Sequence, residues 1–353
     1  MKCLLIIFFI VVLASKAALG AQQSVLDAEA DAIEGATAKG EAPEIETMCR
    51  DRHRSCDDFV EAGNCDINPG WMIMNCPVAC GACHLRSSEL RCQRENMNMS
   101  ADPIYVPGDL QKLFESIIDR FEDRYTINVL SASPYVLTIE DFLSNDEIRA
   151  LIGTVKGWQR STDSGEINSL GQSGSKLSEG RTSSTSWCDG DCESNPHVTS
   201  VYKKIEEMVN IPRSYFESFQ VLRYELGQKY EPHHDYGQGD KYSAAGPRIL
   251  TFFLYLSDVD EGGETQFPAL GLSVKPRKGR AVLWPSVFDH DLHLRDARTM
   301  HEAQPIVSGR KFAANTWIHL YDYVEAQKWG CAGGANYQDP SQLPEDQRAG
   351  FMF

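Results

Sequence analysis

Residues 224–236, YELGQKYEPHHDY, place two histidines beside an aspartate in a segment with the composition of a β-strand. Side chains at positions i and i+2 of a strand point to the same face, so His233 and Asp235 are expected to project together while His234 faces away. An imidazole and a carboxylate on one face can supply two ligands of a non-haem iron site, which needs two histidines and one carboxylate. A histidine in a solvated turn is the alternative interpretation of this short pattern.

Short apolar segments surround this stretch and are separated by glycine and proline. They read SFQVLRYEL, RILTFFLYLS, RAVLWP and KFAANTWIHLY within residues 218–321. Helices are expected before them: an amphipathic helix in residues 110–125, one that begins at Ser144 with Glu147 completing a capping box, and one capped by Asn195. Many short strands after a few helices predict a mainly β fold with flanking helices (α+β), in the form of a jelly roll.

Three blocks in order, RYELGQKYEPHHDY (223–236), RILTFFLYLSDVDEGGETQFP (248–268) and RTMHEAQPIVSGRKFAANTWIH (298–319), resemble the catalytic domain of prolyl 4-hydroxylases. That family consists of Fe(II)- and 2-oxoglutarate-dependent dioxygenases. The resemblance implies a double-stranded β-helix (jelly roll) oxygenase domain at residues 134–325. It also implies hydroxylation of peptidyl proline at C4 with O2 and 2-oxoglutarate, giving succinate and CO2, with L-ascorbate restoring oxidised iron.

The resemblance also assigns residues to roles. It makes His233, Asp235 and His301 the metal ligands; His290 and His293 are alternatives to His301, but neither has a lysine ten residues later. The expected 2-oxoglutarate-binding residues are Lys311, which faces the distal carboxylate, and the hydroxyl donors Thr265 and Tyr224. The expected peptide-groove residues are Glu217, Tyr230, Arg248, Trp317 and His319. Glu302 stands where animal collagen-type enzymes have a small residue, which leaves the substrate open.

The N-terminus has the pattern of a signal peptide at residues 1–20: Lys2, an apolar run from Cys3 to Ala14, and small residues near Gly20. A membrane anchor is the alternative, but the run is shorter than the roughly 20 residues that span a bilayer, and no membrane span is expected in the mature chain. Residues 21–48 carry seven acidic residues, one lysine and no aromatic residue, which predicts a disordered spacer.

Residues 49–83 contain six cysteines, and a segment this short needs cross-links to be stable. A zinc site is the alternative for the closely spaced thiols of CPVACGAC. The spacing and this ending resemble the ShK toxin-like (ShKT) domain, which implies the disulfides Cys49–Cys83, Cys56–Cys76 and Cys65–Cys80. Some members of that family block potassium channels, and many are appended modules, which is the interpretation preferred here.

The remaining segments are a linker at 84–133 and a C-terminal tail at 326–353. The linker contains the sequon at Asn98, a candidate glycosylation site. Outside the ShKT segment, four cysteines allow three pairings, and the sequence does not choose among them; these are Cys92, Cys188, Cys192 and Cys331.

The net charge of −16 makes nucleic acid and anionic lipid poor candidates for partners. The expected partner is a proline-rich peptide or protein, and the expected location is the secretory pathway, chiefly the lumen of the endoplasmic reticulum, with secretion as the alternative. Two other functions stay open at this point. One is a related hydroxylase that acts on lysine or another peptide residue, and the other is a secreted ShKT binding protein whose oxygenase fold is inert.

Overall fold

The computed structural model describes residues 49–167, 173–237 and 243–333. By contacts the chain divides after Cys49, and the described residues from Arg50 onward belong to one unit. The expected signal peptide, the acidic spacer and residues 334–353 of the tail lie outside the described residues.

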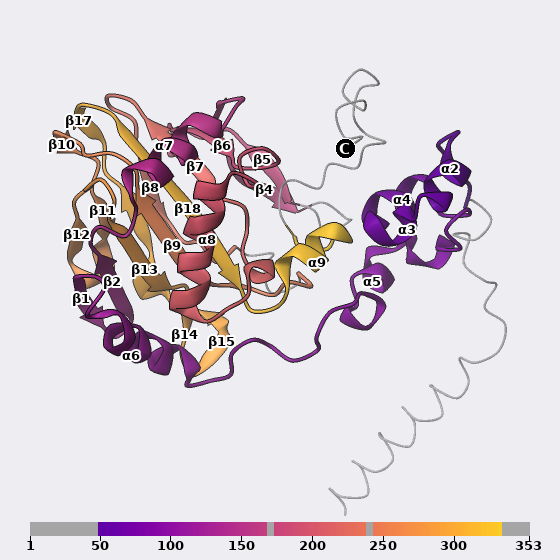
Figure 1. The fold of residues 1–353 in the computed structure, drawn as a ribbon, viewed down its shortest axis with the longest axis horizontal. Coiled ribbons are helices and arrows are strands. Elements are labelled where there is room, and N and C mark those ends of the chain that lie inside the picture. Colours follow the sequence, from indigo (N-terminus) through magenta and orange to yellow (C-terminus); the bar gives the residue numbers. More distant parts are fainter. Residues whose placement is uncertain (1–48, 168–172, 238–242, 334–353) are drawn as a thin grey trace, which may run out of the picture. The chain divides into compact units, whose positions relative to one another are not determined.

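An eight-stranded antiparallel sheet is the largest element of the fold (Figure 1). In spatial order its strands are β1 (Ile127–Ala132), β2 (Tyr135–Ile139), β13 (Ala281–Pro285), β9 (Arg248–Tyr255), β18 (Lys311–His319), β7 (Gln220–Tyr224), β6 (Ser184–Trp187) and β3 (Gln159–Arg160). A second, four-stranded sheet consists of β12 (Leu272–Val274), β11 (Thr265–Phe267), β16 (His301–Ala303) and β8 (Tyr230–His233). The paired strands β10 (Glu261–Gly262) and β17 (Ile306–Ser308), β14 (Val287–Phe288) and β15 (Asp291–Arg295), and β4 (Asp163–Ile167) and β5 (Ser173–Lys176) complete the set. The prediction of a mainly β fold with helices is confirmed.

Alternation along the strands of the large sheet divides the core into two clusters. On β9, Phe252 and Leu254 belong to one cluster, whereas Phe253 and Tyr255 belong to the other. The second cluster also contains Phe267 and Val274 of the small sheet, so it lies between the two sheets. Because strand side chains alternate with a period of two, each central strand of the large sheet supplies both clusters. The candidate site residues lie on the face toward the small sheet.

Helices pack on the other face of the large sheet. They are α6 (Asp109–Phe121), α7 (Asn145–Thr154) and α8 (Pro196–Val209), and Figure 1 shows α8 lying across the strands. The capping box of Ser144 and Glu147 is present at the start of α7, and Asn195 caps α8. The apolar side chains of α6, Phe114 among them, are buried in the first core cluster. The predicted helix starts are therefore confirmed.

The cysteine-rich segment forms three short helices, α2 (Cys56–Glu61), α3 (Asn64–Ile67) and α4 (Pro69–Asn75). Disulfides join Cys56 to Cys76 and Cys65 to Cys80, the pairs that the ShKT resemblance implies. Cys49 and Cys83 are also disulfide-bonded, and their bond to each other stays a prediction. These two bridges join positions 20 and 15 residues apart. A disulfide that closes a loop of this length adds roughly 3 kcal/mol to the free energy of unfolding, which offsets the small apolar core of this segment.

The other cysteines form Cys188–Cys192 and Cys92–Cys331. The first pair joins cysteines four positions apart, and the second joins positions 239 residues apart. Of the three possible pairings, the structure has the one in which the linker is bonded to the C-terminal segment after α9 (Tyr323–Lys328).

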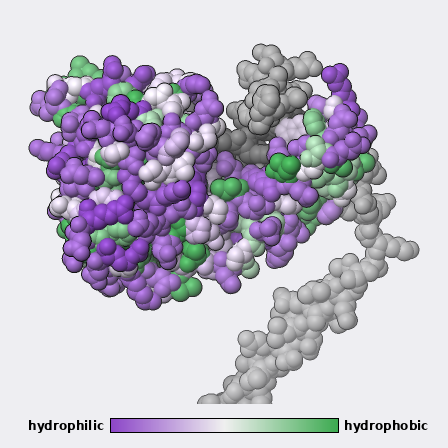
Figure 2. Space-filling model, viewed as in Figure 1, coloured by the Kyte–Doolittle hydropathy of each residue, from purple (hydrophilic) through white to green (hydrophobic). Residues whose placement is uncertain are grey.

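The surface in view is mainly hydrophilic, with scattered apolar residues (Figure 2). Single exposed apolar side chains such as Leu177 and Leu226 are usual on folded proteins. Across the described ranges, no helix is both long enough and apolar enough to cross a membrane.

Candidate metal centre

Two histidines and one aspartate come together where the small sheet meets the core. His301 begins β16 and lies directly opposite His233, the last residue of β8. The Nε2 atom of His301 is 3.6 Å from Oδ2 of Asp235, and one ligand atom from each of the three residues lies within 4.8 Å of the others. Within the described ranges this is the only such group of histidine, cysteine or acidic residues. His290 and His293 lie exposed at the β14–β15 hairpin and take no part.

Backbone carbonyls fix the orientation of both imidazoles. The Nδ1 atom of His233 is 2.9 Å from the carbonyl oxygen of Glu231, and Nδ1 of His301 is 3.0 Å from that of Thr299. A carbonyl can only accept, so each Nδ1 carries a proton and each Nε2 is the ring nitrogen left to face a metal. This is the arrangement in which a metal-ligating histidine donates its other N–H to a backbone oxygen.

The aspartate lies two residues beyond the end of β8, in a bend, so the sequence interpretation extended the strand too far. Thr251 of β9 donates a hydrogen bond of 2.6 Å to its Oδ2. Burial disfavours the carboxylate, but His301, His233 and this hydrogen bond hold the pKa of Asp235 at about 2. Burial, and then the neighbouring His301, lower the pKa of His233 well below its usual value. At neutral pH Asp235 is therefore anionic and His233 neutral, which are the protonation states in which these residues bind a divalent metal.

His234 points away from the cluster, as expected. Its Nδ1 accepts a hydrogen bond from the backbone N–H of Tyr236, and its Nε2 is 2.9 Å from the carbonyl oxygen of Asp296. Both ring nitrogens are used in holding the turn that follows β8. His234 is thus a structural residue.

Lys311, the first residue of β18, is completely buried. Its Nζ donates to the carbonyl oxygen of Gly263 at 2.8 Å and lies 5.2–5.4 Å from the ring centroids of Tyr224, Phe253 and Tyr255. No carboxylate of a described residue forms an ion pair with it. Burial lowers the pKa of Lys311 to about 7. A buried cation without an anionic partner is costly, so this position is prepared for an anion from outside the chain.

Gly262 and Gly263 allow the hydrogen bond between Lys311 and the Gly263 carbonyl. At Gly262 φ is 82°, and a Cβ there would lie 2.3 Å from the carbonyl oxygen of Pro305. Only glycine permits β10 to approach β17 so closely, and the approach places the next carbonyl, that of Gly263, within reach of Lys311.

The expected hydroxyl donors lie in the same region. Tyr224 is opposite Lys311 in the β7–β18 pair, and both are buried. Thr265 is buried on β11, where Tyr255 donates a hydrogen bond of 2.7 Å to its Oγ1. Tyr255 therefore touches both Lys311 and Thr265, and burial raises its pKa far above the usual value. The structure thus brings together the residues assigned to 2-oxoglutarate.

Four of the five expected groove residues form one network. Arg248 donates to both carboxylate oxygens of Glu217, at 2.5 and 3.1 Å, and its guanidinium lies 3.9 Å from the ring centroid of Trp317. His319 Nε2 lies 2.8 Å from the same carboxylate. Burial opposes the charge, yet Arg248 and His319 hold the pKa of Glu217 at about 2. Arg248 also donates to the backbone carbonyl of Asp235, which connects the network to the metal centre.

The fifth residue, Tyr230, stacks on His233 with ring centroids 3.5 Å apart. The guanidinium of Arg181 lies 4.5 Å from the centroid of the same ring and donates to the carbonyl of Thr162 and to the side chain of Gln220. The sequence interpretation missed Arg181, and also missed Thr251. The sequence at Arg181, RTSSTSW at residues 181–187, gives no signal of this role, because the contact with Tyr230 joins positions far apart in the chain.

Comparison with known proteins agrees with this geometry. Residues 219–319, which include the three clustered residues and Lys311, match the 2OG-Fe(II) oxygenase superfamily. Probable prolyl 4-hydroxylase 9 of Arabidopsis thaliana is 36% identical over 213 residues, which cover 56% of this chain and 73% of the relative. The chain belongs to the prolyl 4-hydroxylase family.

Another member of the prolyl 4-hydroxylase family aligns over more of the chain. Probable prolyl 4-hydroxylase 7 of Arabidopsis thaliana is 31% identical over 312 residues, covering 78% of this chain and 95% of the relative. Residues 48–83 match the ShK domain-like model. Among solved structures, a viral collagen prolyl hydroxylase from Paramecium bursaria Chlorella virus-1 in complex with 2OG is 28% identical, with a TM-score of 0.41, and covers 52% of this chain and 95% of its own. The superfamily match and the His–Asp–His cluster support Fe(II) and 2-oxoglutarate as the cofactor and cosubstrate of this family member.

Proposed function

We propose that this chain hydroxylates peptidyl proline at C4, with O2 and 2-oxoglutarate converted to succinate and CO2. The observation that carries the proposal is the group of His233, Asp235 and His301 on the same side of the core as the buried Lys311, which forms no ion pair with any described residue. Family membership indicates the same reaction class, because the relatives are named prolyl 4-hydroxylases.

His233, Asp235 and His301 would hold the metal through two imidazole nitrogens and one carboxylate. When bound, Fe(II) supplies the activation of O2. The chain's own part is to keep these ligands in position: carbonyls fix both rings, and Thr251 fixes the carboxylate. Trp284 and Phe267 pack against His301 with ring centroids 4.9 and 5.7 Å away, which limits access of water on that side.

Lys311 would bind the distal carboxylate of 2-oxoglutarate through a charge-assisted hydrogen bond. The bound anion would offset the free-energy cost of burying the ammonium group, which is uncompensated in the protein free of 2-oxoglutarate. Thr265 and Tyr224 would donate hydroxyl hydrogen bonds to the same carboxylate. Phe253 and Tyr255 border the lysine and keep its surroundings apolar, which strengthens the ion pair.

The groove residues favour a proline-rich peptide over a lysine-containing one. Tyr230 and Trp317 offer flat rings, and Arg248 offers donors to carbonyl oxygens, which suits a peptide in the polyproline II conformation. A lysine side chain near the iron would call for an anionic partner, and the carboxylate of Glu217 is already used by Arg248 and His319. The intact ligand set argues against an inert fold.

We also propose that the protein acts in the lumen of the endoplasmic reticulum and that Asn98 is glycosylated there. The disulfides support an oxidising compartment, and Asn98 is exposed. The N-terminal apolar run would act as the signal peptide. L-ascorbate would serve as the reductant that restores oxidised iron.

Mass spectrometry of a proline-rich peptide tests the proposed reaction. The peptide is incubated with purified protein, Fe(II), 2-oxoglutarate and ascorbate, and amino-acid analysis then distinguishes 4-hydroxyproline from other products. We expect one oxygen atom added per modified proline and an equal amount of succinate. Addition of oxygen to lysine in a matched lysine-containing peptide, with none on proline, would contradict the proposal.

A further inference from the structure

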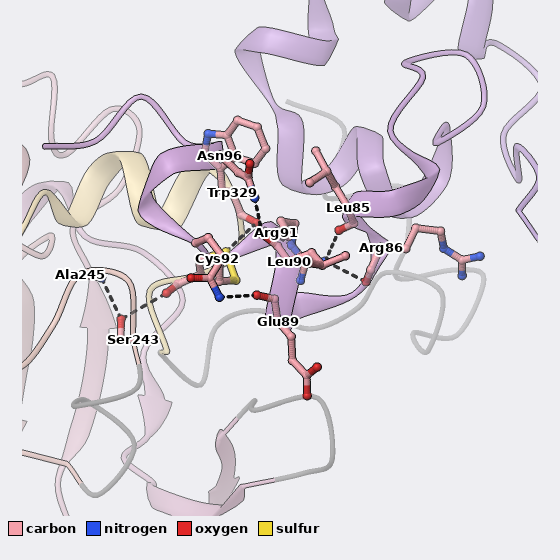
Figure 3. Close-up of a disulfide and its surroundings, with 12 residues drawn as sticks. Leu85, Arg86, Glu89, Leu90, Arg91, Cys92, Asn96, Ser243, Ala245 and Trp329 are labelled. Atoms are coloured by element: carbon pink, nitrogen blue, oxygen red, sulfur yellow. Dashed lines mark hydrogen bonds between the residues drawn. A yellow bond between two sulfur atoms is a disulfide. The ribbon is translucent and has the colours of Figure 1, made fainter. Parts of the chain in front are cut away.

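The Cys92–Cys331 disulfide lies next to a loop, residues 243–246, that contacts the expected peptide groove. It joins the linker after α5 (Ser88–Arg91) to the segment after α9 (Figure 3). Cys331 is buried, and Met97, Ala244 and Tyr323 belong to the same small apolar cluster. The bond therefore fixes a segment that touches the chain just before β9, which carries Arg248 and Thr251.

Hydrogen bonds connect Cys331 to this loop. Its carbonyl oxygen accepts from the backbone N–H of Ala244 at 3.1 Å and from Oγ of Ser243 at 3.2 Å. Ser243 in turn accepts from the N–H of Ala245 (Figure 3). Cys331 therefore holds Ser243 and Ala244, the first two residues of this loop.

Arg94, two residues after Cys92, holds the same loop from the linker side. Its Nε donates to the carbonyl oxygen of Ala244 at 2.9 Å, and its guanidinium lies 3.4 Å from the ring centroid of Tyr321. The backbone N–H of Tyr321 donates to the carbonyl of Ala245. The loop is therefore held from both sides of the disulfide, by Cys331 itself and by Arg94 near Cys92.

The loop continues into the groove network through Gly246. Its φ is 68°, and a Cβ there would lie 2.7 Å from the ring of Tyr321, so the position requires glycine. The Gly246 carbonyl oxygen lies 3.0 Å from Nδ1 of His319, whose Nε2 contacts Glu217 at 2.8 Å. Glu217 then orients Arg248 through two hydrogen bonds.

We propose that the Cys92–Cys331 disulfide is a positioning device for peptide binding. It holds Ser243 to Gly246 so that the Gly246 carbonyl fixes His319, and His319 with Glu217 fixes Arg248. The proposal rests on the proposed function, since the groove residues act on a peptide only in such an enzyme. The bond contacts none of the residues assigned to iron or 2-oxoglutarate, so we expect its loss to act on peptide binding.

The full-length Cys92→Ser/Cys331→Ser variant tests this in two ways. The KM for a proline-rich peptide should rise roughly two- to thirtyfold, with the KM for 2-oxoglutarate and the kcat at saturating peptide unchanged. Amide hydrogen exchange of Ala244, Ala245 and Gly246 should become faster. A variant with faster exchange and an unchanged peptide KM would overturn the proposal, and so would unchanged exchange.

A second variant tests the same connection without removing a disulfide. Ser243→Ala removes the hydroxyl that joins Cys331 to Ala245, and it should raise the peptide KM in the same direction by a smaller factor. If the double variant does not fold, Ser243→Ala decides alone. Gln93→Ala is the matched control, because Gln93 is an exposed linker residue whose side chain donates to the carbonyl of Glu89, and it should change neither KM nor exchange.

Failure of the proposed function is distinguishable from failure of this inference. A wild-type protein that hydroxylates no proline-rich peptide would refute the function, whatever the variants do. An active wild type whose double variant and Ser243→Ala variant both keep the wild-type peptide KM would refute only the role of the disulfide.

Discussion

His301 and His233 are directly opposite in the antiparallel pair of β16 and β8, with ring centroids 4.3 Å apart. This register, together with the bend that carries Asp235, brings three ligand atoms within reach of one ion. A shift of one residue in either strand would turn one imidazole to the opposite face of the sheet. The metal centre therefore depends on strand pairing as much as on the identity of the residues.

The first prediction concerns the metal. We expect His301→Ala to lose stoichiometric iron and all peptide hydroxylation, since two ligands do not hold Fe(II) firmly at neutral pH. Iron analysis of the purified protein and circular dichroism check binding and folding separately. His293→Ala is the control, because that side chain is exposed and does not belong to the cluster. Normal activity in His301→Ala with loss in His293→Ala would show that the ligand is misassigned.

A second prediction follows from the cost of burying Lys311. We expect Lys311→Met to weaken 2-oxoglutarate binding by roughly 2–5 kcal/mol, the usual range when one partner of a buried charged pair is removed. The same change should stabilise the protein free of 2-oxoglutarate, because a pKa lowered from 10.5 to about 7 corresponds to a burial cost of about 5 kcal/mol. Isothermal titration and thermal unfolding measure the two effects. A variant with weaker binding and lower stability would contradict this account of the lysine.

The pH dependence of 2-oxoglutarate binding provides a third prediction. Below pH 7 the ammonium group of Lys311 is charged in the free and in the bound protein, so the affinity is flat. Above about 7 the free lysine loses its proton, whereas the bound one keeps it because the carboxylate raises its pKa. Binding then takes up a proton, and the affinity should fall by up to about tenfold per pH unit. Titrations from pH 6 to 9 test this, and the slope should be absent in Lys311→Met.

Local patterns in the sequence predicted local structure well. The capping box of Ser144 and Glu147 and the cap at Asn195 are each made within a few residues, so their chemistry is visible in the chain. The buried face of α6 follows from apolar residues at helical spacing. The resemblance to prolyl 4-hydroxylases supplied His301 and Lys311, which periodicity alone could not select from the other histidines and lysines.

Features that depend on long-range pairing were not predictable in this way. The stacking of Arg181 on Tyr230 and the hydrogen bond from Thr251 to Asp235 each join segments that are not adjacent in sequence. The Cys92–Cys331 bond was one of three possible pairings, because sequence separation does not determine which thiols meet. The end of β8 at His233 is set by the turn that His234 holds, and no residue pattern marks it.

The fourth prediction concerns the groove network. We expect Glu217→Gln to raise the peptide KM and to lower stability by about 1–3 kcal/mol, because Arg248 loses its anionic partner in a largely buried site. The affinity for 2-oxoglutarate should stay unchanged, since Lys311 lies outside this network. Steady-state kinetics with both substrates and chemical denaturation check the two parts. A drop in 2-oxoglutarate affinity equal to the change in peptide KM would indicate general disruption of the core.

The last prediction concerns the contribution of the cysteine-rich segment to catalysis. A chain shortened to begin at Glu89 keeps Arg91, Cys92 and Arg94, and with them the disulfide and the contacts to Trp329 and Ala244. We expect it to consume 2-oxoglutarate with a short proline-rich peptide at the wild-type rate, because every residue assigned to iron, cosubstrate or groove lies after residue 216. Long natural substrates should be hydroxylated less well if the ShKT segment recruits them.

The matched comparison for this shortened chain is one that begins at Gln93 and therefore lacks Cys92. That chain should show a higher peptide KM than the one beginning at Glu89, since Cys331 would no longer be bonded to the linker. Succinate production with short and long peptides measures both differences. If the chain beginning at Glu89 folds and binds iron yet does not turn over even short peptides, the cysteine-rich segment is part of the catalytic unit, and its separation from the oxygenase domain is wrong.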